Sequence, residues 1–166
     1  MMIKIIPLLI ILVFTLTTSA QKNTQTYNVK TNSLKVKKVI ETFFEGLHKG
    51  DSIIVSTTLH RDIKIQTTAT NKLGENILTT DTKEKLLTSV ANKKPEHTYF
   101  EKLLSFDIKI DGNLASVWTP YEFYLNGNFS HCGANSFQLF NNNGKWEIIF
   151  LVDMRRDNCN ALKEKK

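Results

Sequence analysis

The C-terminal half of the sequence constrains the fold most, because it is a series of long β-type runs joined by very short turns. The runs cover residues 99–110, 114–125, 129–140 and 145–154, and the turns between them read DGN, NGN and NNNG. Asn, Asp and Gly tolerate the positive φ angles that tight hairpins require. We therefore expect four consecutive antiparallel strands, one face of which other elements must cover.

The N-terminal half carries helical patterns that can cover this sheet. Residues 34–47 repeat apolar side chains every three or four positions, which predicts a helix with one broad apolar face. Asp51 is expected to cap a second helix over residues 52–59. Asp81 and Glu84 resemble a capping box and open a third helix. The predicted fold class is α+β, with three N-terminal helices packed on a mainly antiparallel sheet.

Between the second and third helices, the runs RDIKIQTTAT and ENILTT alternate in the manner of strands and are expected to pair across the turn NKLG. The sequence contains no internal repeat and no linker to a second domain. We assign residues 33–159 to a single domain. A polar, flexible leader at residues 21–32 precedes it, and a disordered tail at residues 160–166 follows it.

The first 20 residues have the pattern of a secretory signal peptide. One lysine precedes an apolar run over residues 5–16, and small residues end at Ala20. This run is shorter than the roughly 20 residues that span a membrane, which disfavours a retained anchor. We predict cleavage near Ala20 and an exported protein, periplasmic or secreted, with no membrane contact after cleavage.

The net positive charge of the chain is explained by a solvated surface. Removing residues 1–20 from the 166 leaves 146 residues with 21 basic and 16 acidic side chains, a net charge of +5. The basic residues are dispersed over expected helix faces and the tail, and an exported protein seldom meets nucleic acid. We therefore expect one hydrophobic core, a solvated basic surface and no nucleic-acid partner.

The chain has two cysteines, Cys132 and Cys159. An even number in an exported protein predicts one disulfide. Closing the loop between them would stabilise the fold by about 3.5 kcal/mol on the chain-entropy model. The alternative is a Cys132 nucleophile activated by His131, but adjacent residues of a strand point to opposite faces. We assign Cys132 to the bridge and leave His131 for another role.

The register of the long hairpin decides which side chains meet inside. A three-residue turn at residues 126–128 places Tyr121 opposite Gly133 and directs both Tyr121 and His131 inward. It also gathers a continuous apolar inner face, formed by Phe106, Ile108, Ile110, Ala115, Val117, Phe137, Leu139, Trp146, Ile148 and Phe150. The same count directs an outer set away from the helices, and this face is apolar enough to suggest a homodimer contact: Ser116, Trp118, Glu122, Tyr124, Phe140, Ile149, Leu151 and Asp153.

Four polar residues interrupt the apolar inner face near one end of the sheet: Thr119, Tyr121, His131 and Asn135. Burying each without a partner would cost roughly 1 to 3 kcal/mol. A cavity open at one end would satisfy all four, and aromatic walls with a few polar groups are typical of a small-molecule site. These four are the predicted ligand-binding residues. In the alternative interpretation, Tyr121 bonds the backbone, His131 lies on a hairpin rim and Asn135 holds a bulge.

Three residues are candidates for a catalytic role, namely His131, His60 and Tyr121. His60, where the second helix meets the first strand, could reach the same mouth; His60 or His131 would then act as base and Tyr121 as oxyanion donor. His48 and His97 look like surface residues. The sequence has no nucleophile elbow, Walker loop, dinucleotide fingerprint or zinc-ligand spacing, so we predict no cofactor and no metal.

The element order, the run "IDGNLASVW" and the closing "FQLFNNNGKWEIIFLVDMRRDNC" resemble the nuclear transport factor 2-like (NTF2-like) superfamily. The resemblance is greatest to its small exported bacterial proteins, the SnoaL-like and lumazine-binding subgroup. It covers residues 34 to about 159. It implies a cone-shaped α+β fold, in which a curved sheet wraps around the helices and leaves a pocket at the open end, with frequent dimers through the outer sheet face.

Members of that superfamily include isomerases, cyclases and dehydratases, and also proteins that only bind a molecule, so the fold does not select a function. Isomerase-type members place a carboxylic acid in the pocket. In this sequence, only Tyr121 corresponds in residue type to the catalytic residues of those members. We find no Asp or Glu on the inner face of the long strands. The leading prediction is an exported domain that binds a small, partly aromatic molecule. An isomerase, cyclase or dehydratase is the first alternative, and a protein-interaction module that uses the outer sheet face is the second.

Overall fold

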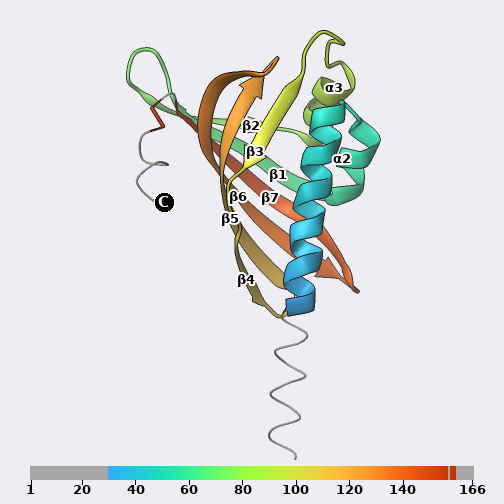
Figure 1. Ribbon diagram of the computed structural model, residues 1–166. Coiled ribbons are helices and arrows are strands. Elements are labelled where there is room, and N and C mark those ends of the chain that lie inside the picture. The colour runs from blue at the N-terminus through green and yellow to red at the C-terminus, as the bar shows by residue number, and fades with distance from the viewer. Residues whose placement is uncertain (1–29, 157, 160–166) are drawn as a thin grey trace, which may run out of the picture.

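A computed structural model describes residues 30–156 and 158–159 of the chain. In this part, a seven-stranded sheet curves around the helices, which lie on its concave side (Figure 1). The predicted α+β fold class is confirmed. The predicted signal peptide at residues 1–20, nearly all of the leader and the tail at residues 160–166 lie outside the described residues.

The helices lie close to their predicted positions. The first covers residues 30–49, followed by α2 (Ser52–Thr58) and α3 (Lys83–Ala91). Residues 30–32 are therefore helical, although we had placed them in the leader. The helix includes them because its first turn still packs on the domain, where Thr31 and Leu34 form a wall of one cavity with Trp146.

One predicted helix cap is confirmed and one is wrong. The side chain of Asp51 accepts hydrogen bonds of 3.0 Å from the amides of Ile53 and Ile54, as expected for a cap of α2. The cap of α3 is Thr82, whose hydroxyl accepts the amide of Lys85 at 3.1 Å. Asp81 instead ends the preceding strand and forms an ion pair with the Lys85 ammonium.

The strands are β1 (Leu59–Thr70), β2 (Asn76–Asp81), β3 (Tyr99–Leu103), β4 (Asp107–Asp111), β5 (Leu114–Leu125), β6 (Asn128–Asn142) and β7 (Lys145–Arg156). Their order in the sheet is β2-β1-β7-β6-β5-β3, and β4 also pairs with β5. All pairs are antiparallel except β1 with β7. The predicted hairpin of β1 and β2 and the meander of β5, β6 and β7 are confirmed.

The predicted strand over residues 99–110 is wrong, because it divides into β3 and β4. Both pair with β5, on either side of Thr119 and Pro120. Proline has no amide hydrogen and cannot donate to an edge strand. The chain breaks its ladder at this point and keeps one bond, from the Leu104 amide to the Pro120 carbonyl at 2.9 Å.

The hairpin between β5 and β6 turns through two residues, not the predicted three. Asn126 and Gly127 both have positive φ, and Leu125 pairs with Asn128. A β-bulge at Ser130 then shifts the register by one residue. Beyond the bulge, Tyr121 pairs with Gly133, so the predicted facing pairs are right although the predicted turn is wrong.

A second bulge changes the inner face of β7. Leu139 pairs with Ile148 and Gln138 with Phe150, so Ile149 has no opposite residue. The predicted directions are therefore reversed beyond this point. Leu151, which we had placed outside, joins the core. Phe150, which we had placed inside, pairs with Gln138. The Gln138 amide donates to the hydroxyl of Ser116, a residue of the predicted outer set, so Phe150 lies on the outer face. The reversal also brings Asp153, predicted to lie outside, to a buried position.

The core between helices and sheet contains most of the predicted inner set. Ala115, Val117, Phe137, Leu139 and Trp146 are buried there with Ile148, and Phe106, Ile108 and Ile110 pack against them. On the outer face, Trp118 keeps 49% of its surface exposed. None of the helices in the described residues is long and apolar enough to cross a membrane.

Candidate functional site

A cluster of polar side chains, which we call the buried polar group, occupies the inner face at the β3 side of the sheet. Tyr121 and Asp153 are buried in it, and Arg155 at its edge keeps 56% of its side chain exposed. The Tyr121 hydroxyl donates to Asp153 Oδ1 at 2.8 Å, and the Arg155 guanidinium donates to Asp153 Oδ2. Burial raises the pKa of the Tyr121 hydroxyl, and the charge of Asp153 beside it raises it further. Tyr121 is therefore a neutral hydrogen-bond donor that already has its acceptor.

Gly133 makes room for this phenol. A Cβ atom at position 133 would lie 1.9 Å from the Met154 carbonyl oxygen and 2.6 Å from the Tyr121 hydroxyl. Neither the backbone of β7 nor the buried ring can move away easily. Glycine is therefore required here by the close approach of Tyr121 to β6, which the sequence analysis did not anticipate.

A second carboxyl group, that of Glu101 on β3, joins the buried polar group. The Asn135 amide donates to Glu101 Oε1 at 2.6 Å. Burial raises the pKa of Glu101 to about 7, and the negative charge of Asp153 adds to this effect; the hydrogen bond from Asn135 and the charge of Arg155 oppose it. Glu101 thus exchanges a proton near neutral pH.

The structure brings three of the four predicted ligand-binding residues together. The His131 ring stacks on Phe123, with ring centroids 4.8 Å apart, and meets Tyr121 edge to face at 5.9 Å. Asn135 reaches the same group through Glu101. Thr119 is buried, and its hydroxyl donates only a long bond of 3.5 Å to the adjacent Pro120 carbonyl. The inward direction predicted for Tyr121 and His131 is therefore right.

His60 does not join this group. Its ring packs edge to face on Phe140, with centroids 6.5 Å apart, and its Nδ1 accepts the Asp62 amide at 3.2 Å. Phe140 lies near the opposite end of β6 from His131. The prediction that His60 reaches the same mouth is wrong, because β1 pairs with β7 from its first residue and holds His60 at the far end of the sheet.

The predicted disulfide is present. Cys132 and Cys159 are bridged, with Cα atoms 6.0 Å apart. The bridge joins β6 to the segment that follows β7, close to the buried polar group. It excludes Cys132 as a nucleophile in this form of the protein, and it is typical of proteins in an oxidising environment.

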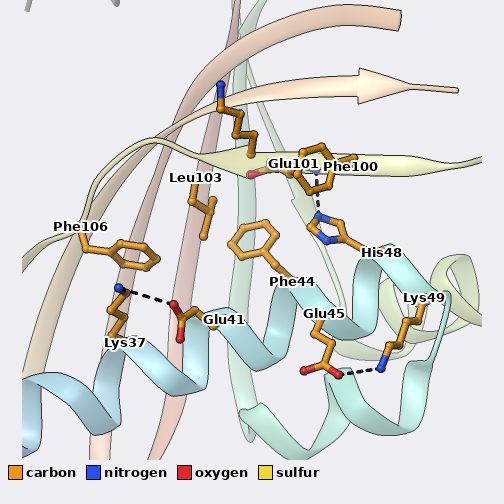
Figure 2. A pocket seen from close by; sticks show the side chains of 11 residues that line it. Lys37, Glu41, Phe44, Glu45, His48, Lys49, Phe100, Glu101, Leu103 and Phe106 are labelled. Atoms are coloured by element: carbon orange, nitrogen blue, oxygen red, sulfur yellow. Dashed lines mark hydrogen bonds and ion pairs between the residues drawn. The ribbon is translucent and has the colours of Figure 1, made fainter. Parts of the chain in front are cut away.

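A cavity of about 620 Å³ lies between the first helix and β3, with Glu101 in its wall. Figure 2 shows Phe44 and His48 rising from the helix toward β3, while Phe106 and Leu103 lie along the other side. Four apolar side chains, those of Phe44, Phe100, Leu103 and Phe106, line the cavity together with His48 and six charged residues. None of the four predicted ligand-binding residues lines it; Glu101 alone connects it to the buried polar group, through Asn135.

His48 holds the strand edge above this cavity. Its Nε2 accepts the backbone amide of Glu101 at 2.9 Å, and its ring lies 5.2 Å from that of Phe100, centroid to centroid. Burial lowers the pKa of His48, and the nearby Lys93 lowers it further. The sequence analysis placed His48 on the surface; it is in fact half-buried, because the end of the helix packs against β3.

The charged side chains along the helix side of the cavity are paired with one another. Lys37 lies 3.6 Å from Glu41, and Lys49 lies 2.7 Å from Glu45, as the dashed lines in Figure 2 mark. On the strand side, Lys102 pairs with Glu122 at 3.1 Å. Among the described residues, no ion pair involves Glu101.

A second cavity of about 510 Å³ lies against the first turns of the same helix. Lys35, Lys38 and Lys145 border it, and Trp146 forms part of its wall. It contains no carboxyl or imidazole group among its described lining residues. It therefore offers a ligand fewer kinds of polar contact than the cavity that holds Glu101.

Sequence reasoning missed Glu101 and Asp153, which carry the electrostatics of the site. The alternation of Tyr99, Glu101 and Leu103 on one face of a strand was a usable signal for Glu101. Asp153 gave no such signal, because the β-bulge at Ile149, earlier in the same strand, decides which face Asp153 occupies. No group of three His, Cys, Asp or Glu side chains in the described residues could hold a metal ion.

Comparisons with known proteins identify the fold. No model of a known protein family matches the sequence, and no curated protein matches it. Among solved structures, a protein of unknown function with a cystatin-like fold from Nostoc punctiforme is similar with a TM-score of 0.60 and 16% identity, over 78% of this chain and 94% of that one. An NTF2-like protein with a cystatin-like fold from Novosphingobium aromaticivorans has a TM-score of 0.64 and 10% identity, over 87% and 94% of the chains.

A third similar structure comes from the same bacterium and is a protein proposed as the beta subunit of an aromatic-ring-hydroxylating dioxygenase. Its TM-score is 0.63 and its identity 14%, over 79% of this chain and 92% of that one. At these identities the likeness establishes the fold alone. The chain has the cone-shaped α+β fold of NTF2-like proteins, as the resemblance in the sequence had predicted.

Proposed function

We propose that this protein binds a small, partly aromatic molecule in the cavity between its first helix and β3. The observation that carries the proposal is the composition of that cavity. Its volume of about 620 Å³ is in the range of small-molecule sites, its walls include Phe44, Phe100 and Phe106, and one partly buried carboxyl group, that of Glu101, opens into it. The aromatic walls would supply affinity, and the charged side chains of the lining, among which Glu101 forms no ion pair in the described residues, would supply orientation.

The predicted ligand-binding residues take an indirect part in this proposal. Asn135 fixes the Glu101 carboxyl by its hydrogen bond of 2.6 Å, while Tyr121 and His131 fill the space behind it. Asp153 and Arg155 neutralise one another next to the same carboxyl. The ligand would contact Glu101, Asn135 would position that carboxyl, and Asn135, Asp153 and Arg155 would set its pKa together with burial.

An acid–base enzyme of the isomerase or dehydratase kind is the second candidate, and the observation that favours it is the pKa of Glu101. A carboxyl group with a pKa of about 7 is well suited to move protons at neutral pH. However, the Tyr121 hydroxyl already donates to Asp153 and is buried, so it is not free to stabilise an oxyanion. For this reason we place binding first.

Export and self-association remain part of the proposal. The disulfide between Cys132 and Cys159 supports an oxidising, exported location. Cleavage near Ala20 stays a prediction from the sequence. The exposed Trp118 and Phe129 support a homodimer through the outer sheet face. Sedimentation of the protein and of Trp118→Glu tests the second point: a monomeric parent protein would contradict it.

The proposed function is tested by native mass spectrometry of the protein purified from its exporting host. We expect a retained small molecule, and its loss in Phe44→Ala, because Phe44 supplies a wall of the cavity. Leu34→Ala, on the same helix but at the second cavity, is the matched control and should retain the molecule. Equal retention by both variants would contradict the assignment to this cavity. Turnover of the molecule by the unaltered protein would favour the enzyme.

A further inference from the structure

Glu101 is the one carboxyl group of the cavity that lacks a cationic partner in the described part of the chain. The other acidic groups of the lining, Glu41 and Glu45, each have a lysine one helical turn away. Behind the cavity wall, Asp153 pairs with Arg155. The lining holds three lysines and three glutamates, but Lys102 pairs with Glu122 instead of Glu101. An ionised Glu101 therefore has no cation within ion-pair distance in the described part of the chain.

We propose, on the basis of the binding function above, that the ligand is an organic cation: a protonated amine or basic nitrogen on an aromatic or apolar body, with Glu101 as its counter-ion. A cation placed beside Glu101 would restore charge balance in a partly buried site, where an unpaired charge is costly. The aromatic rings of Phe44 and Phe100 favour the same class, because a cation is attracted to the faces of aromatic rings. The ring of Phe106 already has the Lys37 ammonium 5.1 Å from its centroid.

The opposite classes fit less well. A carboxylate or phosphate ligand would meet the Glu101 carboxyl and, behind it, Asp153, while the lysines near the cavity are already paired. A neutral hydroxyl compound could donate to Glu101 but would leave its charge without a counter-ion. A cationic ligand satisfies both the hydrogen-bonding and the charge requirement of the site.

Binding of such a cation should strengthen as Glu101 loses its proton, near pH 7. Several charged or titratable groups face the carboxyl: His48, Lys37, Glu41, Glu45 and Lys49 on the helix, Lys102 on β3, Tyr121 on β5, and Asp153 and Arg155 on β7. A variant is needed to separate Glu101 from these. Glu101→Gln removes the charge and keeps the shape, whereas Glu84→Gln makes the same change on the exposed surface of α3 and serves as control.

The test uses three probes of matched shape, namely benzylammonium, benzyl alcohol and benzoate, and isothermal titration calorimetry between pH 5.5 and 8.5. We expect benzylammonium to bind best and its Kd to fall about tenfold over this range. Glu101→Gln should lose the pH dependence and bind benzylammonium no better than benzyl alcohol, while Glu84→Gln should behave as the unaltered protein does.

Each of the other outcomes contradicts either the cationic ligand class alone or the proposed binding function as well. If benzyl alcohol or benzoate binds as tightly as benzylammonium at pH 8.5, the cationic class is wrong and the proposed binding function stands. If none of the three probes binds, both proposals are overturned. The pH series on the unaltered protein needs no variant, so the inference remains testable even if Glu101→Gln does not fold.

Discussion

The inner face of the sheet has two halves that are buried alike and stabilised differently. In the apolar half, Val117, Phe137, Leu139 and Ile148 are between 0% and 1% exposed. In the polar half, Thr119, Tyr121, Asn135 and Asp153 are between 0% and 9% exposed. Burial therefore does not distinguish the half that holds the fold together from the half that borders the candidate site.

The difference between the halves lies in what each side chain requires. An apolar side chain gains stability from any close neighbour that removes it from water. A polar side chain must have a specific partner, and its burial costs stability when that partner is missing. Tyr121 thus depends on Asp153, and Asn135 on Glu101, whereas Phe137 depends only on dense packing from Phe43 and Phe44.

The largest effect is expected from truncation in the apolar half. Phe137→Ala removes a fully buried ring that meets Phe43 and Phe44 at centroid distances of 6.0 and 6.2 Å. We expect the free energy of unfolding to fall by about 3 to 5 kcal/mol, measured by urea denaturation. Phe129→Ala, on the same strand but half exposed, is the control and should cost much less. Equal losses would show that this half is not a packed core.

Removing a partner in the polar half should have the next largest effect. Asp153→Ala leaves the buried Tyr121 hydroxyl without its acceptor, whereas the exposed Arg155 side chain can turn to water. We expect a loss of about 1 to 3 kcal/mol, measured by the same denaturation. Asp107→Ala, which breaks only an exposed pair of 3.7 Å with Lys109, should change stability by less than about 1 kcal/mol. Two similar values would mean that the buried network is no stronger than a surface pair.

The sequence predicted the apolar half well, because local pattern decides it. The alternation in β5 and β6 and the helical spacing before them identify the core without knowledge of any partner. The first bulge did little harm to this prediction: an extra residue at Ser130 compensated for the shorter turn, so Tyr121 still faces Gly133. The single disulfide also followed from the number of cysteines alone.

The polar half could not be predicted to the same depth, because its partners come from distant strands. The second bulge, at Ile149, turns Leu151 and Asp153 inward, and nothing in the local pattern of β7 marks it. Pro120 divides the edge into β3 and β4, and the position of Glu101 beside Asn135 depends on that break. A single insertion or interruption in a strand is thus enough to hide the position of an inward-facing carboxyl from sequence analysis.

A smaller effect, specific to the polar half, is expected from the protonation of Glu101. Its pKa is about 7 in the folded protein against an ordinary value of 4.5, so the folded protein holds more protons than the unfolded chain between these values. The free energy of unfolding should therefore fall as the pH rises from about 4.5 to 7 and level off above. Between pH 5.5 and 8 this loss amounts to at most about 2 kcal/mol.

Urea denaturation at a series of pH values measures this loss, and Glu101→Gln should abolish it. His48, whose pKa is lowered by burial and by Lys93, contributes a slope of the opposite sign near pH 6.5 in both proteins, so the difference between them isolates Glu101. Glu84→Gln should keep the profile of the unaltered protein. If all three profiles coincide, the surroundings of Glu101 do not raise its pKa, and the argument from its burial is wrong.

The smallest effect is expected where the two halves meet, at Thr119. Its side chain is fully buried, yet its hydroxyl makes only the 3.5 Å bond to the next carbonyl, so replacing that hydroxyl by a methyl group removes little. We expect Thr119→Val to change the free energy of unfolding by less than about 1 kcal/mol, in either direction. Thr58→Val is a useful comparison, because the equally buried Thr58 donates a bond of 2.7 Å to the Val55 carbonyl and should lose more. A larger loss at Thr119 than at Thr58 would mean that Thr119 has a stronger partner, such as a ligand or an ordered water. It would extend the candidate site to the boundary with the apolar half.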